Sequence, residues 1–352
     1  MARRTIGSTW ARMAQQQARW VLRRALGEGT KALRRSGRAT AAVPRKASVT
    51  TPRERFGLGV AAGPAGLRRY RFFKPVGLPK GQMHPLLVLL HGCGQSATDF
   101  AASTRMNRLA TLNGFMVLYP EQDRLANAQG CWNWFDTRNG RAQQEAASIV
   151  AALDHACGLH AIDTNRVAII GMSAGASMAA LVALQFPQRF AAVIMHSGVE
   201  PTLAHSAATA LSAMRANYRV PPRPPPHALP QDLPALLVIQ GSADPVVVRA
   251  NGMRAAQVWA ARTHALPGPA RLVRRGKRYP QTAMDWFASK RLQVSLREIN
   301  GLGHAWSGGA ASQAYSDPKG PDASRMVWTF AQRQFELRAT RVRHQIENLP
   351  HF

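Results

Sequence analysis

The chain has 352 residues, of which 46% are hydrophobic and 18% are charged. This composition is too apolar for a disordered chain and too low in charge for a long coiled coil, and the length allows one large domain or two small ones. Three cysteines are too few for a disulfide scaffold, and no run of about 18 apolar residues predicts a membrane span.

The formal net charge of +28 is concentrated near the N-terminus. Residues 1–80 hold 19 Lys or Arg against 2 Asp or Glu. An arginine-rich arm of this kind binds nucleic acid or another anionic surface by releasing counterions, or it is simply a solvated tail. Both interpretations remain open from charge alone.

Residues 10–26 predict an amphipathic helix within this arm. Apolar residues such as Trp10 and Leu22 share one face, and arginines such as Arg12 and Arg19 share the opposite face. Such a helix lies on a membrane or another apolar surface, or it docks on the domain that follows.

From residue 69 onward, short apolar runs alternate with helical stretches. Most of the runs are unbroken, as in strands that are covered on both faces. Alternation of this kind predicts an α/β fold with a mainly parallel sheet and helices on both faces. The predicted strands are 70–73, 86–90, 115–119, 167–170, 192–195, 235–239 and 294–299. The predicted helices are 101–112, 143–155, 176–186 and 323–335.

Residues 171–175 read Gly-Met-Ser-Ala-Gly and fit the pattern G-x-S-x-G. The pattern alone is common by chance, but here it joins a predicted strand to a predicted apolar helix, as a nucleophile elbow does. We therefore predict that Ser173 is a nucleophile. The alternative is a helix-capping serine at an ordinary turn. Ser177 is a weaker candidate because it lies inside the helix and lacks flanking glycines.

A serine nucleophile needs a base, and the base needs an orienting acid. Asp244 follows the predicted strand 235–239, and His304 follows the predicted strand 294–299. The same chain order, Ser then Asp then His, occurs in hydrolases whose serine lies on a nucleophile elbow between a strand and a helix. Taken singly, Asp244 fits a turn residue and His304 a solvated loop residue, but together with Ser173 they predict a catalytic triad.

Other residues compete weakly for these roles. Asp285 falls in what we interpret as a helix, and Asp317 and Asp322 come after the histidine in the chain. His196 directly follows a predicted strand and is the second choice of base.

An oxyanion needs hydrogen-bond donors, which backbone amides supply in such hydrolases. The amide of Ala174 follows the nucleophile, and that of Cys93 lies in a glycine-rich bend after the predicted strand 86–90. We predict these two donors, although the bend is equally compatible with a plain turn. The cysteines lack metal-binding spacing, so we expect no metal and no cofactor.

Several segments together resemble the polyhydroxybutyrate (PHB) depolymerase family of esterases, which are α/β-hydrolases related to feruloyl and acetylxylan esterases. The resemblance covers about residues 69–338. The segments that carry it are 91–95 (HGCGQ), 104–107 (TRMN), 119–122 (YPEQ), 131–135 (CWNWF), 171–175 (GMSAG) and 303–309 (GHAWSGG).

The resemblance implies that Ser173, Asp244 and His304 correspond to the family's triad. It also implies that the amide of Cys93 helps to form the oxyanion hole. Cys93 and Cys131 lie in segments that the family places near the active site, so the resemblance allows a disulfide between them.

Three functions follow as hypotheses. The first is a serine esterase that hydrolyses hydroxyalkanoate oligomers or their polymer through an acyl-enzyme, and the second is a feruloyl or acetylxylan esterase. The third is a basic, surface-binding protein built on an inactive hydrolase scaffold. We expect Trp132, Trp134 and Trp306 to form an apolar rim for substrate, although at least one of them also fits core packing.

The predicted organisation is a basic arm and linker (1–68, with the linker at 37–66), a catalytic domain (69–338) and a C-terminal tail (339–352). Seven prolines between residues 221 and 234 predict an extended surface insertion at 201–234. We expect residues 1–60 to contact a polymer granule or an anionic surface, and no specific nucleic acid. No apolar h-region follows the first arginines, so the sequence predicts a cytoplasmic location, although family members are often exported.

Overall fold

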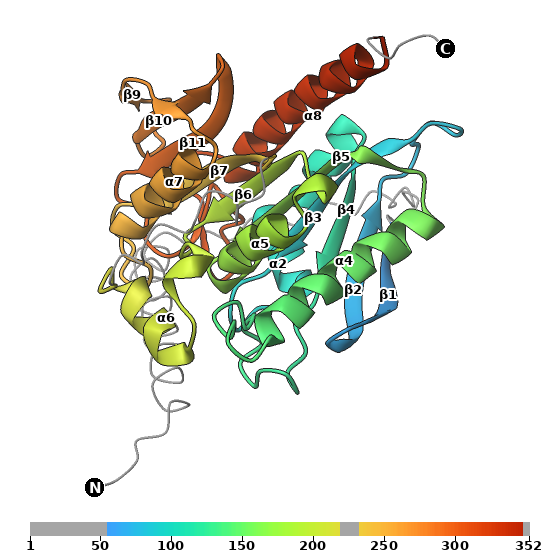
Figure 1. Cartoon of the computed structure of the whole chain (residues 1–352), viewed down its shortest axis with the longest axis horizontal. Helices are drawn as coiled ribbons and strands as arrows, with labels where there is room; N and C mark the ends of the chain where they lie inside the picture. Colours follow the sequence, from blue (N-terminus) through green and yellow to red (C-terminus); the bar gives the residue numbers. More distant parts are fainter. Residues whose placement is uncertain (1–54, 219–231, 348–352) are drawn as a thin grey trace, which may run out of the picture.

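The computed structural model describes residues 55–218 and 232–347, and its main feature is one large sheet (Figure 1). The sheet has eleven strands, which run in the order β1-β2-β4-β3-β5-β6-β7-β11-β10-β8, with β9 paired to β10. Their bounds are β1 Arg55–Gly63, β2 Gly66–Lys74, β3 His84–Leu90, β4 Met116–Pro120, β5 Ile162–Met172, β6 Ala192–His196, β7 Ala235–Gly241, β8 Leu266–Pro267, β9 Arg271–Val273, β10 Gln281–Ala288 and β11 Arg291–Ile299. The short strands β12 (Trp306–Ser307) and β13 (Ser316–Asp317) form a separate pair.

The middle of the sheet is parallel, and both of its edges are antiparallel. Strands β4, β3, β5, β6, β7 and β11 run parallel to one another. Strands β3, β4, β6 and β7 are buried along their whole length, which explains their unbroken apolar sequences. Antiparallel strands β1 and β2 close one edge, and β8, β9 and β10 extend the other.

Helices cover both faces of the sheet and create two cores. Helices α4, α5 and α7 contribute to one core, and α2, α3 and α8 contribute to the other (Figure 1). The helices are α2 Ala97–Thr104, α3 Met106–Asn113, α4 Arg141–Leu159, α5 Ala174–Gln185, α6 Ala207–Met214, α7 Ala250–Arg262 and α8 Ala323–Glu347, with short 3-10 turns η1 (Pro187–Arg189) and η2 (Pro201–Leu203). The predicted α/β class, with a mainly parallel sheet and helices on both faces, is confirmed.

The interpretation of residues 37–66 as a linker is wrong from Arg55 onward. Residues 55–63 form β1 and pair with β2 in register along their whole length. Two of the glycines that gave this segment a linker-like composition are needed for packing. A Cβ on Gly59 would lie 2.2 Å from the ring of Tyr70, and one on Gly63 would lie 2.7 Å from Ser148 Oγ.

Three other boundaries differ from the predictions. The predicted helix 101–112 is two helices, because Arg105 adopts a left-handed conformation with φ 54° between α2 and α3. The segment 201–234 is not extended throughout, since its first part contains η2 and α6. The predicted tail 339–352 is helical as far as Glu347, because α8 continues beyond residue 338.

The predicted N-terminal helix 10–26, the first part of the predicted linker and the proline-rich stretch 219–231 lie outside the described residues. In the part of the chain that the structure describes, no helix combines the length and the apolarity needed to cross a membrane.

Candidate active site

Ser173 lies at a sharp turn between β5 and α5. Its backbone angles are φ 56° and ψ −122°, a conformation that L-residues rarely adopt, and its N–H donates to the carbonyl of His196 at 2.9 Å. The glycines on either side are sterically required. A Cβ on Gly171 would lie 2.0 Å from the carbonyl oxygen of Gly175, and one on Gly175 would lie 2.3 Å from that of Leu90. This tight turn leaves Ser173 only half-buried.

The three residues predicted to act together meet at the carboxyl ends of the parallel strands. Nε2 of His304 lies 3.0 Å from Oγ of Ser173, and Nδ1 of His304 lies 2.8 Å from Oδ2 of Asp244. Asp244 follows β7 and His304 follows β11, which are adjacent parallel strands. With Nδ1–H donating to the carboxylate, Nε2 is left free to accept the serine proton.

Asp244 is held in its ionised form. Burial alone would raise the pKa of this carboxyl group, but the charge and the hydrogen bond of His304 act in the opposite direction. The amides of Val246 and Val247 also donate to Oδ1, both at 2.9 Å. The net result is a pKa below the ordinary value, so the carboxylate is charged at neutral pH and orients His304.

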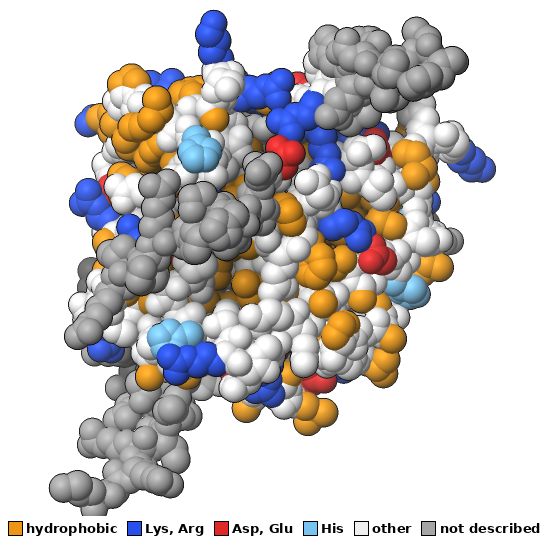
Figure 2. Space-filling view, in the orientation of Figure 1, with side chains coloured by type: hydrophobic (Ala, Val, Ile, Leu, Met, Phe, Trp, Pro, Cys, Tyr) orange, Lys and Arg blue, Asp and Glu red, His pale blue; other side chains and the backbone are white. Residues whose placement is uncertain are grey.

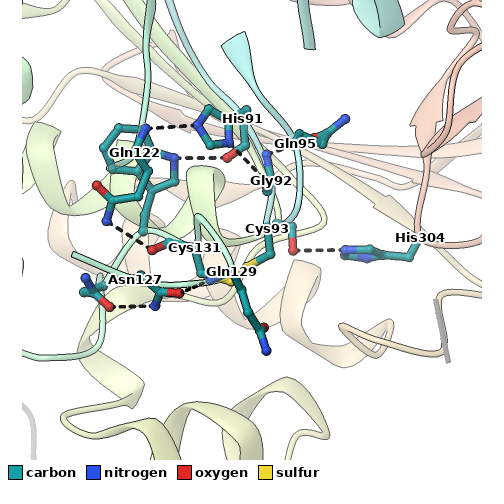
Figure 3. Close-up of a disulfide and its surroundings, with 12 residues drawn as sticks. His91, Gly92, Cys93, Gln95, Gln122, Asn127, Gln129, Cys131 and His304 are labelled. Carbon is teal, nitrogen blue, oxygen red and sulfur yellow. Dashed lines mark hydrogen bonds between the residues drawn. A yellow bond between two sulfur atoms is a disulfide. The ribbon is translucent and has the colours of Figure 1, made fainter. Parts of the chain in front are cut away.

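A small pocket opens beside the serine. Its wall consists of Gly92, Cys93, Gln95, Met172, Ser173, His304 and Tyr315. Cys93 therefore lies in the same pocket wall as Ser173 and His304, and Ala174 is the first residue of α5, where a helix leaves its N–H groups without an intrahelical acceptor. Cys93 is bonded to Cys131 in a disulfide, and Figure 3 shows His304 facing this loop.

The expected tryptophan rim is wrong. Trp132 and Trp306 are fully buried and Trp134 is 2% exposed, so none of them reaches the pocket. Their indole groups have internal partners instead: Nε1 of Trp132 donates to His91 O, and Nε1 of Trp306 donates to Ser324 Oγ. A tryptophan whose N–H is satisfied inside the protein needs no surface position.

The sequence analysis missed the side chains that do line the pocket. Met172 directly precedes Ser173 and occupies a variable position of the G-x-S-x-G pattern, so its place next to the predicted nucleophile could have indicated a pocket residue. Tyr315 lies eleven residues after His304 in a loop with positive φ, and nothing in the sequence marks it. Gln95 lies at the end of the HGCGQ segment, and its Oε1 accepts the N–H of Gly92.

The competing residues have other partners. His196 is buried, stacks on Trp306 and accepts the N–H of Ser307 at Nε2, so it does not face Ser173 as a base. Asp285 lies on β10, not on a helix as expected, and pairs with Arg271 and Arg297.

The remaining competitors also serve local structure. Ser177 is buried in α5, where its Oγ accepts the N–H of Val199. Asp322 accepts the N–H of Arg325 in the first turn of α8, and Asp317 accepts that of Lys319.

Two buried histidines should make the stability of the fold depend on pH. Burial lowers the pKa of His91 to about 4 and that of His196 to about 3, whereas an exposed histidine titrates near 6.5. Between about pH 6.5 and 4 the unfolded chain therefore binds protons that the folded protein does not, so acidification favours unfolding. We expect the free energy of unfolding, measured by urea denaturation, to fall by roughly 2 to 4 kcal/mol from pH 7 to 5.

The substitution His196→Gln should flatten this pH dependence, because it removes one of the two groups. Replacing the exposed His205 by asparagine should leave the dependence unchanged. Equal stability of the wild-type protein at pH 7 and pH 5 would contradict the expectation.

Comparison with known proteins adds a family model and several relatives. The model described as Esterase PHB depolymerase matches residues 68–260. Poly(3-hydroxyalkanoate) depolymerase C of Paucimonas lemoignei is 36% identical over 152 residues, which are 43% of this chain and 36% of that protein. Feruloyl esterase B of Thermothelomyces thermophilus is 32% identical over 117 residues, which are 33% of this chain and 39% of that protein. The chain thus matches less than half the length of either relative.

Solved structures agree in fold. Acetyl xylan esterase from Aspergillus awamori superposes with a TM-score of 0.58 at 19% identity, and the match covers 70% of this chain and 94% of that one. An esterase from Pyrobaculum calidifontis gives a TM-score of 0.50 at 17% identity, with 81% of this chain and 87% of that one covered. The chain adopts the α/β-hydrolase fold.

Proposed function

The chain belongs to the PHB depolymerase family of esterases, whose model matches more than half of its length, and from this premise we propose that it is a serine esterase. The observation that carries the proposal is the hydrogen-bonded series Asp244–His304–Ser173, with contacts of 2.8 and 3.0 Å. Series of this kind activate a serine hydroxyl for attack on an acyl group.

In the proposed reaction, Oγ of Ser173 attacks the ester carbonyl while Nε2 of His304 takes the hydroxyl proton. The oxyanion of the tetrahedral intermediate accepts hydrogen bonds from the amides of Cys93 and Ala174. His304 then gives its proton to the leaving alcohol, and an acyl-enzyme remains on Ser173. A water molecule, deprotonated by His304, attacks the acyl-enzyme; the acyl–Oγ bond then breaks, Oγ of Ser173 takes the proton back from His304, and the acid is released.

The test of this proposal is hydrolysis of p-nitrophenyl butyrate by the purified protein. Turnover well above the buffer rate is expected, and its loss on treatment with a serine-directed organophosphate should follow. An inactive wild-type protein would instead support the alternative hypothesis of a surface-binding protein on an inactive scaffold.

For the substrate, we propose a hydroxyalkanoate ester, as oligomer or polymer. Two observations support this choice. Besides Gly92 and Gln95, the pocket wall around Ser173 and His304 contains Met172, Tyr315 and Cys93, and these three side chains suit an aliphatic acyl chain. The depolymerase of Paucimonas lemoignei is also the relative with the higher identity of the two described above.

The second candidate is a feruloyl or acetylxylan esterase, which is favoured by the relatives that carry those names. Rates on 3-hydroxybutyrate oligomers, methyl ferulate and acetylated xylan distinguish the two. A kcat/KM on the oligomers at least tenfold above that on the other two is expected. A preference for ferulate or acetylxylan would replace the first candidate by the second.

We also propose that the basic arm attaches the enzyme to a polymer granule or to an anionic surface. Residues 1–50 contain 12 Lys or Arg and one acidic residue. The described face in Figure 2 also carries many more Lys and Arg than Asp and Glu side chains. Basic groups of this density favour an anionic surface through electrostatic attraction.

Deletion of residues 1–54 tests the role of the arm, and it spares β1, which begins at Arg55. Binding to polyester particles or anionic vesicles should weaken at least tenfold, while turnover of soluble esters should persist. Equal binding by both forms would reject a role for the arm, and binding that is insensitive to salt would reject its electrostatic part.

A further inference from the structure

The loop that contains Cys93 is attached to residues 127–133 at His91, Cys93 and Gly94, and we call residues 127–133 the clamp. The carbonyl of His91 accepts the indole N–H of Trp132 at 3.1 Å. Cys93 is bonded to Cys131, and the N–H of Gly94 donates to the carbonyl of Gln129 at 2.9 Å. Figure 3 shows the disulfide between Cys93 and Cys131, with His304 on the other side of Cys93 from the clamp. The chain is thus held at Cys93 itself, two residues before it and one residue after it.

The clamp has no regular secondary structure, and a buried carboxylate secures it. Glu145 of α4 is 1% exposed. Its Oε2 accepts the backbone N–H of Asn133 at 2.9 Å, and its Oε1 accepts the side-chain amides of Asn133 at 2.6 Å and Gln122 at 2.9 Å. Three donors therefore converge on one carboxylate, which fixes the end of the clamp against a helix of the core.

Gln122 joins the clamp and the Cys93 loop in the same network. Its side-chain amide also donates to the carbonyl of Cys131 at 3.1 Å, and its backbone N–H donates to Nε2 of His91 at 3.1 Å (Figure 3). Arg68 donates to Oε1 of Gln122 at 2.7 Å. A continuous series of bonds therefore leads from Glu145 through Cys131 to Cys93.

We propose that Cys131 and Glu145 are positioning residues that hold the Cys93 amide in the oxyanion hole, an inference that rests on the proposed esterase function. Glycines flank Cys93 on both sides, and Gly94 has φ +75°, so the loop backbone restrains this amide little by itself. An oxyanion donor stabilises the transition state only when it points at the position that the charge will occupy. A displacement of about 1 Å can lower the rate about 10²-fold.

The proposal makes the activity dependent on the redox state of the disulfide. A water-soluble phosphine reduces it: the S–S bond breaks, the two sulfurs take the hydrogens of one water molecule as thiols, and phosphorus takes its oxygen. The reduced enzyme retains Cys93 and its amide but loses the covalent attachment to the clamp.

The experiment compares wild type, Cys131→Ala, Glu145→Gln and Cys157→Ser. Cys157 is the free cysteine of the described residues and lies on α4, so its variant controls for thiol effects outside the clamp. In Glu145→Gln, an NH2 group replaces one carboxylate oxygen. Two donors then face each other where the N–H of Asn133 now meets Oε2, so one of the three contacts is lost. The measurements are kcat and KM for p-nitrophenyl butyrate, the inhibition constant of a trifluoromethyl ketone and the melting temperature.

We expect kcat of Cys131→Ala and of Glu145→Gln to fall about 10- to 100-fold, with KM changed less than about twofold. The ketone forms a tetrahedral oxyanion on the serine, so its affinity should fall by a similar factor. The phosphine should lower kcat of wild type and of Cys157→Ser to the level of Cys131→Ala, and it should leave Cys131→Ala unchanged.

The variants could instead melt at a lower temperature but show unchanged kcat and ketone affinity in assays well below their melting temperatures. That result would overturn the proposal, because the disulfide would then only stabilise the fold. Unfolding of both reduced wild type and Cys131→Ala at assay temperature would also overturn it, because the bond would then be needed for the fold itself. Absence of esterase activity in the oxidised wild type would refute the proposed function instead.

Discussion

Replacement of Ser173 by alanine should lower kcat for p-nitrophenyl butyrate by at least about 10³-fold, because it removes the hydroxyl that is hydrogen-bonded to Nε2 of His304. KM should change little, since the pocket wall is otherwise intact. Alanine adopts the φ of 56° at this turn with the same strain as serine, so the fold should be retained. A fully active variant would remove Ser173 from the mechanism.

Ser177→Ala is the matched control for this substitution. Ser177 lies one helical turn further along α5, and its Oγ accepts the N–H of Val199 at 3.0 Å. Its loss leaves a buried donor unpaired and should destabilise the fold by about 1–3 kcal/mol. Below the melting temperature, kcat should stay within a fewfold of wild type.

Replacement of Gly175 by alanine should lower the free energy of unfolding by about 3–5 kcal/mol. Destabilisation of this size is seen only for severe defects such as steric conflicts in the core. The new Cβ would lie 2.3 Å from the carbonyl oxygen of Leu90 and 2.5 Å from that of His91. Both are backbone atoms at the end of β3, so relief requires movement of α5 or of the sheet rather than rotation of a side chain. Urea denaturation at pH 7 measures the change.

Gly158→Ala is the control for a glycine without a close neighbour. A Cβ at this position of α4 meets nothing within 4 Å, and alanine is the better helix former by about 1 kcal/mol. This variant should therefore be as stable as wild type or slightly more stable. A Gly175→Ala protein of wild-type stability would show that α5 does not pack as closely on β3 as the geometry requires.

The central strands and the meeting of Ser173, Asp244 and His304 could be predicted because they follow simple rules. Strands covered on both faces have unbroken apolar sequences, and β3 and β7 are clear examples. Catalytic groups in open parallel sheets follow the carboxyl ends of strands, which singled out Asp244 and His304. The turn at Ser173 also has a sequence signature, because only glycine fits at residues 171 and 175.

Other features depend on contacts that no local pattern reveals. Strand β1 has a linker-like sequence because Gly59 makes room for Tyr70 on the paired strand β2, and Gly63 makes room for Ser148, which is distant in the chain. The strand containing Asp285 was missed because its charge is balanced by Arg271 and Arg297 on neighbouring strands.

The tryptophans were misplaced for a similar reason. They were expected to form an apolar rim for substrate, whereas the indole N–H groups of Trp132 and Trp306 have acceptors inside the fold. Internal partners of this kind come from residues distant in the sequence, such as His91 for Trp132. Sequence patterns therefore predict which residues are apolar, but not which apolar residues line a pocket.

The central claim is that Ser173 is the nucleophile of an esterase, and covalent labelling with diethyl p-nitrophenyl phosphate tests it most directly. The account predicts one diethylphosphoryl group per chain, located on the peptide that contains Ser173, with loss of activity in proportion to labelling. Labelling should be absent in Ser173→Ala and much slower in His304→Ala. Attachment to any other residue, or full activity in a protein labelled at Ser173, would contradict the account.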